Sequence, residues 1–218
     1  MKKVISFSLW GSDPKYCIGA LRNAELAKSV YPGWETWFYC GKSVPEEIIK
    51  NIKSLGGLVI PKEENGDWTG MFWRFETIAH PEVEIMVSRD TDSRLTLRES
   101  LAVNQWLESD MLFHVMRDHP AHSVPILGGM WGARKPILGD MNYLMNSYNK
   151  GNFWQVDQNF LKDIIWPRVA YTTFTHDEIF SKNCPFPSPR IDNEFVGDVF
   201  DEKDIRHPEY WKDIVKIK

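Results

Sequence analysis

At the start of the chain, short apolar runs typical of strands alternate with segments whose apolar residues have the spacing of a helix. This alternation limits the fold classes that the chain can adopt. The first apolar run is followed by turn residues and then by a helical pattern that Pro32 and Gly33 end. Repeated β-α units of this kind form parallel sheets with right-handed crossovers. The pattern therefore predicts an α/β fold with a mainly parallel sheet. The expected elements are strands over 4–9, 35–40 and 58–60 and helices over 15–30 and 44–55.

The rest of the chain continues the pattern without an internal boundary. Thr96 and Glu99 have the spacing of a capping box, which predicts the start of a helix. No repeat, linker or low-complexity segment divides the sequence, so we expect one domain over 1–218 with an irregular tail over 184–218. The further expected elements are helices over 68–79, 96–107, 137–149 and 155–165 and strands over 83–87, 111–116, 125–133 and 169–174.

Charge, cysteine content and hydropathy exclude several classes of protein. With 26 Lys and Arg against 30 Asp and Glu, the formal net charge is −4, which argues against a nucleic-acid partner. Cys17, Cys40 and Cys184 have no disulfide-rich or zinc-binding spacing, which fits a reducing compartment such as the cytoplasm. A membrane-spanning helix needs about 18 consecutive apolar residues, and the sequence has no such run, so no membrane span is expected.

The most specific chemical motif is Asp90-Thr91-Asp92, which follows the expected central strand over 83–87. In extended backbone, residues two apart point to the same side, so the two carboxylates repel unless a divalent cation lies between them. The carboxyl ends of strands in open α/β sheets are where ligands bind. The motif therefore predicts a Mg²⁺ or Mn²⁺ site that could hold a diphosphate. The alternative is a solvated acidic turn with Arg89 and Arg94 as its partners.

Several motifs occur in an order that resembles nucleotide-sugar glycosyltransferases of the GT-A fold. The triplet alone is generic, and the ordered combination is considerably more specific. Within this fold the chain is similar, over nearly its whole length, to viral glycosyltransferase domains that build capsid glycans. The segments that carry the resemblance are 4–11, 68–75, Asp90-Thr91-Asp92, Gly128-Gly129-Met130-Trp131-Gly132, Asp157-Gln158, His176-Asp177 and Pro185-Phe186-Pro187.

The resemblance implies a GT-A, Rossmann-like domain with a mixed, mainly parallel sheet. It implies a UDP-sugar donor held with Mn²⁺ or Mg²⁺, and transfer of the sugar to a hydroxyl of a glycan or glycoprotein acceptor. A metal held by carboxylates would neutralise the charge that gathers on the departing diphosphate. For the viral enzymes the sugar is rhamnose, and we expect inversion at the transferred carbon. For a viral protein, the expected location is the host cytoplasm.

The resemblance also assigns the charged residues of the site. Asp92 is expected as the direct metal ligand, while Asp90 reaches the ribose or shares the metal. His176 is the candidate third ligand, although an isolated loop histidine is often structural. Arg74 is expected beside the diphosphate, where its guanidinium offsets negative charge. A salt bridge from Arg74 to Glu76 or to a neighbouring acid is the alternative.

The donor site is expected to include two loops. Leu9, Trp10 and Gly11 follow the first strand, where the nucleotide base docks in this fold. Trp10 could stack on uracil or could belong to the core, and Gly11 would allow close approach of backbone. Gly128 and Gly129 match the place where backbone passes the donor sugar. Paired glycines weaken a strand, so a close neighbour or a β-bulge is needed to explain them.

Attack by a sugar hydroxyl needs a base, since an alcohol is a poor nucleophile near neutral pH. Asp157, in the first turn of an expected helix, is our first candidate, and helix capping is its alternative role. Asp118 is a further candidate. His119 and His122 are candidates for binding the acceptor or a phosphate, and they are too closely spaced on their loop to form a metal site alone.

Two other functions fit parts of the sequence. A non-catalytic carbohydrate-binding module would use some of the ten tryptophans as stacking platforms. A nucleotidyltransferase also binds metal through carboxylates, but it should carry a basic, glycine-rich loop after the first strand. Residues 9–14 contain one glycine, Gly11, and no Arg or Lys. The glycosyltransferase hypothesis therefore accounts for more of the chain than either alternative.

Overall fold

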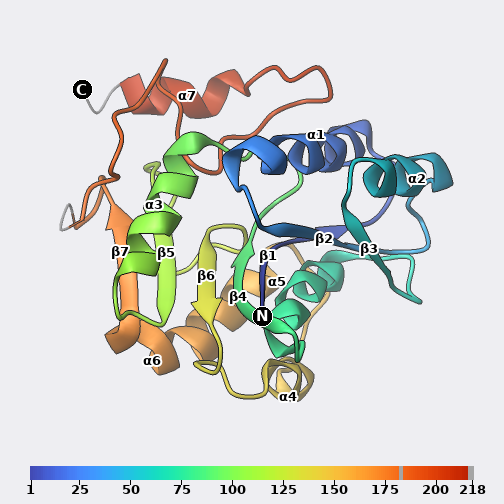
Figure 1. Ribbon diagram of the computed structural model, residues 1–218, viewed down its shortest axis with the longest axis horizontal. Helices are drawn as coiled ribbons and strands as arrows, with labels where there is room; N and C mark the ends of the chain where they lie inside the picture. Colours follow the sequence, from blue (N-terminus) through green and yellow to red (C-terminus); the bar gives the residue numbers. More distant parts are fainter. Residues whose placement is uncertain (182–183, 216–218) are drawn as a thin grey trace.

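The structure is a computed structural model that describes residues 1–181 and 184–215. Within these residues, seven strands form one sheet in the order β3-β2-β1-β4-β6-β5-β7 (Figure 1). Neighbouring strands are parallel except around β6, which runs antiparallel to both β4 and β5. The predicted mixed, mainly parallel sheet is confirmed. The strands are β1 (Lys2–Leu9), β2 (Glu35–Cys40), β3 (Leu58–Pro61), β4 (Val83–Ser88), β5 (Phe113–Arg117), β6 (Trp131–Arg134) and β7 (Thr173–Asp177).

Helices cover both faces of the sheet, and each face has its own hydrophobic cluster. One cluster joins the sheet to α1 (Pro14–Val30), α2 (Glu46–Ser54) and α3 (Leu97–Glu108). The other joins it to the 3-10 helix η1 (Trp68–Ala79), α4 (Met141–Ser147), α5 (Val156–Phe160), the π-helical turn η2 (Leu161–Ile165) and α6 (Trp166–Val169). A short 3-10 turn, η3 (Ala170–Thr172), leads into β7, and α7 (Pro208–Val215) lies in the tail.

The alternation of side chains along β1 explains how η1 is attached to the sheet. The odd-numbered residues of Ile5–Leu9 are buried against α1 and α2. Ser6 and Ser8 point to the other face, where η1 lies. The Ser6 hydroxyl donates to the Arg74 carbonyl (2.8 Å), and the Arg74 amide donates to the Ser8 hydroxyl (3.0 Å). Two serines in an apolar strand therefore fix the position of Arg74.

Several expected boundaries move in the structure. The strand expected over 125–133 begins at Trp131, so the paired glycines precede β6 rather than forming part of it. The last strand begins at Thr173 because the chain stays helical through η3. Thr96 caps α3 as predicted, with its hydroxyl accepting from the Glu99 amide (3.3 Å). The Glu99 carboxylate does not complete the capping box, because it binds the guanidinium of Arg89 (2.8 Å) instead.

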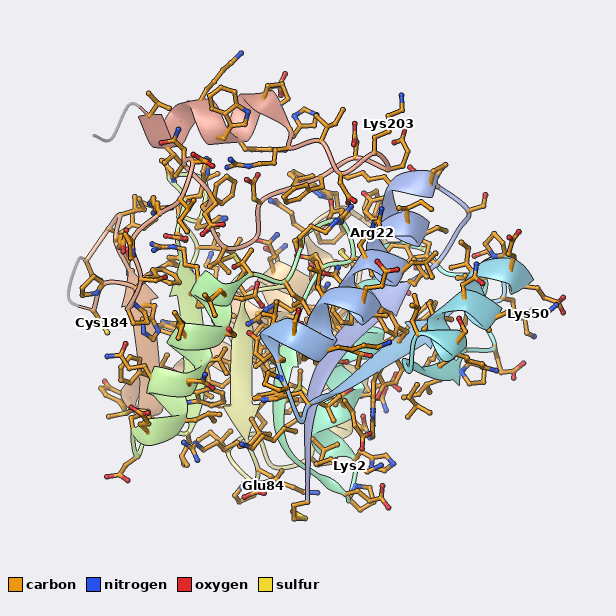
Figure 2. All side chains as sticks on the ribbon, turned by 45° about the horizontal axis from the view of Figure 1, so that its top comes forward. Lys2, Arg22, Lys50, Glu84, Cys184 and Lys203 are labelled. Carbon is orange, nitrogen blue, oxygen red and sulfur yellow. The ribbon has the colours of Figure 1, made fainter. Side chains whose placement is uncertain are left out.

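The tail is more ordered than the sequence predicts. It contains α7 and runs along the top of the molecule past α3 and α1, where it is coloured red in Figure 1. Figure 2 places its loop at Lys203 close to Arg22 of α1, in agreement with an ion pair between Arg22 Nε and Asp204 Oδ2 (2.8 Å). The Phe200 amide also donates to the carbonyl of Asp92 (2.9 Å). The tail therefore crosses the acidic loop.

Two further findings concern the helices. In the described part of the chain, no helix is both long and apolar enough to span a bilayer. Helix α1 packs directly against the acidic loop at Gly19. A Cβ atom at this position would lie 1.9 Å from the Thr91 carbonyl oxygen and 2.9 Å from Arg94 Nη1. A glycine here lets the helix backbone contact the loop backbone and limits where the loop can lie.

We predict that Gly19→Ala destabilises the protein. Alanine favours a helix over glycine by about 1 kcal/mol, but the added methyl group would overlap a backbone oxygen that cannot rotate away. Overpacking of this kind costs about 1–3 kcal/mol, so the free energy of unfolding in urea should fall. Ser29→Ala, on the exposed side of the same helix, is the control and should change it by less than about 0.5 kcal/mol. Wild-type stability of Gly19→Ala would disprove the contact.

Candidate active site

The Asp90-Thr91-Asp92 triplet leaves the carboxyl end of β4, which lies between β1 and β6 in the sheet. Two hydrogen bonds shape the loop, since the Ser93 hydroxyl donates to the Asp90 carbonyl (2.9 Å) and Asn23 Nδ2 donates to the Ser93 carbonyl (2.9 Å). The Asp90 side chain is 47% exposed, whereas that of Asp92 is 18% exposed. Asp90 is therefore the carboxylate that a ligand reaches more easily.

A buried guanidinium joins two acids that are far apart in the sequence. Arg74, whose side chain is 4% exposed, contacts Asp90 through Nη1 and Asp157 through Nη2, the latter at 3.0 Å. Its Nε is buried and has no hydrogen-bond partner among the described residues. Glu76 binds Lys62 (2.7 Å), so the sequence alternative of an Arg74–Glu76 pair is not formed. Arg74 thus lies beside the two acids and forms ion pairs with them, which is the second form of the sequence alternative, and its role at a diphosphate stays a prediction.

Asp157 lies in the first turn of α5, where the sequence placed it. Its Oδ1 accepts from the Gln158 amide (2.9 Å) and its Oδ2 from Arg74, so both oxygens are engaged. Burial raises the pKa of the Asp157 carboxyl, and the positive charge of Arg74 opposes this effect while Asp90 adds to it. Gln155, two residues before Asp157 at the N-cap of α5, has a φ of 69°, in the left-handed region that non-glycine residues rarely adopt. The structure therefore brings Asp157 to Asp90 through a single arginine.

The paired glycines pass close to these side chains. A Cβ at Gly128 would lie 2.3 Å from Asp157 Oδ2 and 2.5 Å from Arg74 Nη2, and a Cβ at Gly129 would lie 2.0 Å from Asp90 Oδ2. The Ser88 hydroxyl of β4 donates to the Gly128 carbonyl (2.7 Å) and holds the segment there. The close neighbours that explain the glycines are thus the charged side chains themselves, and any larger residue would displace them.

The sequence gives no direct signal for the partner of Asp92. Lys15 Nζ lies 2.8 Å from Asp92 Oδ2. Lys15 is in the first turn of α1, where its amide donates to Asp13 Oδ1 (2.9 Å) and caps the helix. Burial raises the pKa of the Asp92 carboxyl, and the charge of Asp90 raises it further, while Lys15 opposes both effects. Asp92 therefore lies in surroundings that favour a positive charge beside it.

The loop after β1 borders the site in part. Leu9 is buried in the core, so only its backbone is available to a ligand. Gly11 has a φ of 73°, and its amide donates to the Ser43 hydroxyl (2.7 Å). Trp10 is half buried against Trp73, with ring centroids 6.1 Å apart in an edge-on arrangement. Trp10 therefore has a structural contact in addition to the base-stacking role expected from the sequence.

The structure does not bring His176 to the acidic pair. His176 lies on β7 at the edge of the sheet, and β6 and β5 separate that strand from β4. Its Nδ1 is 2.8 Å from His114 Nε2, and its Nε2 is 3.0 Å from Gln105 Oε1. With both ring nitrogens engaged in the interior, His176 has no free nitrogen for a metal. The ligand set of two aspartates and this histidine is therefore not assembled.

The two loop histidines expected at the acceptor instead attach the tail. His119 accepts from the Ala121 amide (3.0 Å) and places its Nε2 2.8 Å from the Tyr210 carbonyl, while its ring packs on Phe195. His122 Nδ1 accepts from the Asp118 amide (3.0 Å). Both rings are buried. These contacts leave neither histidine open to an acceptor in this structure.

Asp118, our other candidate base, is a structural anchor. Its carboxylate accepts two bonds from Arg98 (2.8 and 3.0 Å), one from Arg190 (2.5 Å) and one from the Val196 amide (2.9 Å). Arg190 and Val196 belong to the tail, so this fully buried acid ties the tail to α3 and β5. A carboxylate with four donors on it has no lone pair directed at a substrate.

The acidic side chains of the site match a metal site in which the substrate supplies part of the coordination shell. Among the described residues, no group of three or more His, Cys, Asp or Glu side chains could by itself hold a metal ion. Mg²⁺ often binds through one or two carboxylates and fills its shell with waters and substrate phosphates, and Asp90 and Asp92 match that pattern. Three carboxylates, including Asp157, lie against the two cations Arg74 and Lys15. A divalent cation would therefore turn the site positive and favour an anionic ligand.

The buried histidines should make stability depend on pH. Burial lowers the pKa of His122 to about 3 and that of His176 to about 4. An unfolded histidine has a pKa near 6.5, so below this pH the unfolded chain binds more protons than the folded one. The stability that the neutral histidines contribute is therefore complete above pH 6.5 and is lost as the pH falls toward 4.

Below about pH 6, each histidine should lower the free energy of unfolding by about 1.4 kcal/mol for each pH unit of acidification. His122→Asn keeps an acceptor near the position of Nδ1 and should make the slope shallower, measured by urea unfolding from pH 8 to 4.5. The difference between variant and wild type at pH 8 gives the pH-independent effect of the substitution. Parallel curves for the two proteins would contradict a neutral, buried His122.

The fold is similar to that of known glycosyltransferases. The sequence matches no family model and no curated protein. A glycosyltransferase involved in glycosylation of the major capsid of PBCV-1 is similar in structure, with a TM-score of 0.55 at 15% identity over 85% of this chain and 91% of its own.

Glucosyl-3-phosphoglycerate synthase from Mycobacterium tuberculosis is also similar. Its complex with UDP has a TM-score of 0.53 at 12% identity, over 80% of this chain and 69% of its own. Its complex with Mn²⁺, UDP-glucose and phosphoglyceric acid has a TM-score of 0.53 at 13% identity, over 80% of this chain and 68% of its own. At such low sequence identity, the similarity shows the fold alone. The chain has the fold of the GT-A glycosyltransferases.

Proposed function

We propose that this protein is a metal-dependent glycosyltransferase that moves a sugar from a UDP-sugar to a hydroxyl of a glycan or glycoprotein. The observation that carries the proposal is the pair Asp90 and Asp92 at the carboxyl end of β4 in a GT-A fold, with Asp90 half exposed beside a buried arginine. The Mycobacterium tuberculosis synthase of this fold has been crystallised with Mn²⁺ and UDP-glucose and with Mg²⁺ and UDP. These complexes support the same classes of donor and ion here.

The chain's own residues would orient the donor. When bound, Mn²⁺ or Mg²⁺ supplies Lewis-acid stabilisation of the charge on the departing diphosphate. Asp92 and Asp90 would hold the ion, with Asp90 also able to reach the ribose. Arg74 holds Asp90 in place before any ligand arrives, so little reorganisation is needed at the moment of reaction. Backbone at Gly11 and Gly129 would lie against the nucleoside and the sugar.

Asp157 is the residue that we propose as general base, and single displacement with this base would invert the transferred carbon. The hydrogen bonds from Arg74 and from the Gln158 amide fix its orientation. Its pKa, raised by burial, makes the carboxylate a stronger base than an exposed aspartate. The anomeric configuration of the product, determined by NMR, separates this inverting route from a retaining one.

An acceptor glycan would need a surface next to Asp157, and exposed aromatic residues precede it. Trp154 is 66% exposed and Phe153 is also exposed. Three residues of chain span at most about 10 Å, so the backbone of Trp154 lies within that distance of the backbone of the proposed base. An indole offers a flat apolar face to a sugar ring and one polar N–H. For the donor, the resemblance to viral capsid-glycan enzymes supports rhamnose, which we propose as the first sugar to test beside glucose.

Replacing either acid of the pair should abolish metal-dependent turnover. Asp92→Asn and Asp90→Asn remove the charge that would hold the ion, and we expect Mn²⁺-dependent hydrolysis of, or transfer from, a UDP-sugar to fall by about a hundredfold or more. Release of UDP is the measurement. Asp110→Asn, an exposed acid outside the site, is the matched control and should keep full activity.

Two results would overturn the proposed function. One is full activity of Asp92→Asn, and the other is undiminished wild-type activity in excess chelator. Binding to a glycan array without nucleotide, together with no turnover of any UDP-sugar, would instead indicate a carbohydrate-binding module.

Trp154→Ala should weaken acceptor binding and leave donor hydrolysis intact. Because the indole would contact the acceptor and not the diphosphate, KM for the acceptor should rise about tenfold, as expected for the loss of about 1.4 kcal/mol of contact, while hydrolysis without acceptor stays unchanged. Tyr171→Ala is the matched control, since the Tyr171 side chain is almost fully exposed. Tyr171 precedes the amino end of β7, whereas the acidic loop follows the carboxyl end of β4. Equal acceptor KM values for the two variants would remove Trp154 from the acceptor site.

A further inference from the structure

Lys15 is a cation bound directly to Asp92, one of the two acids that we propose as metal ligands. Its Nζ lies 2.8 Å from Asp92 Oδ2, and the two side chains are 31% and 18% exposed. The carboxylate of Asp92 therefore faces little water, and Lys15 supplies positive charge where a metal ion would sit.

The position of Lys15 allows it to leave that acid without unfolding anything. It is in the first turn of α1, and its backbone is held by the Asp13 cap and not by its side chain. A lysine side chain has four methylene groups and a compact ammonium with three donors, so the charge can swing while the helix stays still. The backbone of Asp92, by contrast, is held by the tail, because its carbonyl accepts from the Phe200 amide (2.9 Å).

The loaded site would have no room for both cations on Asp92. Two positive charges at one carboxylate repel each other, and the divalent one is held more strongly. A bound nucleoside diphosphate would bring phosphate oxygens to the same place. An ammonium released from Asp92 would find there a new acceptor of higher negative charge.

We propose that Lys15 exchanges partners during donor binding: its ammonium pairs with Asp92 while the site lacks a metal, and it moves to the diphosphate of the donor when the ion and the nucleotide are bound. This inference rests on the proposed function and adds a donor-binding residue to it. Lys15 would keep the empty acidic site compact and would couple the binding of metal to the binding of nucleotide.

The exchange makes two predictions of opposite sign for one substitution. Lys15→Met keeps the length of the side chain and removes its charge. Mn²⁺ alone should bind the variant about threefold to tenfold more tightly, because no ammonium has to leave Asp92 first. UDP in saturating Mn²⁺ should bind about tenfold or more weakly, because a charged hydrogen bond to the diphosphate is lost. Isothermal titration of Mn²⁺ alone, and then of UDP with Mn²⁺ present, measures both.

Three comparisons make the experiment decisive. Lys28→Met, an exposed lysine on the same helix, should match wild type in both titrations. Lys15→Gln is a second neutral variant, and circular dichroism confirms that each variant is folded. Both neutral variants should show the two opposite shifts.

Failure of this inference differs from failure of the proposed function. If Mn²⁺ binds wild type and not Asp92→Asn, while Lys15→Met changes neither titration, the metal site stands and the exchange is disproved. If Lys15→Met weakens Mn²⁺ and UDP binding alike, Lys15 only supports the site and the exchange is again disproved. If wild type binds no Mn²⁺ even with UDP present, the proposed function and this inference both fail.

Discussion

The candidate site depends on one buried positive charge. The guanidinium of Arg74 has almost no contact with water, and it is stable in the interior because Asp90 and Asp157 accept from it. Its backbone is in turn fixed to β1 by Ser6 and Ser8. Without Arg74 the Asp157 carboxylate would be a buried charge without a counter-ion, a situation that costs about 3–5 kcal/mol in other proteins. The geometry of the acids is therefore a property of the fold and not of a flexible loop.

The topology of the sheet explains why the acids can meet at all. Asp90 follows β4, and one of the two strands beside β4 is β6, which runs the opposite way. The segment entering β6 therefore passes the point where β4 ends, and Gly128 and Gly129 let it pass without displacing Asp90 or Asp157. The tail then crosses the same loop through its bond from Phe200. A single antiparallel strand in a mainly parallel sheet thus creates the crowded edge at which a ligand could be gripped.

Local patterns predicted what depends on neighbours in sequence. Strand and helix periodicity located most of the elements, the Thr96 cap is formed, and Asp90-Thr91-Asp92 stands at the end of a central strand. What the sequence did not reveal depends on long-range pairing. Nothing local to Lys15 indicates that its ammonium reaches Asp92, and nothing in the spacing of His176 indicates that both of its nitrogens are engaged in the interior. A resemblance could suggest which residue types surround a site, but only packing decides which partner each one finds.

Exposure distinguishes the candidate site from two other buried arginine–acid pairs of the same chemistry. In the pairs Arg89–Glu99 and Arg98–Asp118 the acid is fully enclosed, and the arginine donates to backbone carbonyls as well. These pairs join elements of the fold, and their acids are not accessible to a ligand. The Arg74 cluster has the same kind of buried pair in Asp157, but its second acid, Asp90, is half exposed. An acid whose orientation is fixed from the interior while one side meets solvent contributes little to stability. It is, however, well placed to take a ligand whose charge is opposite to its own.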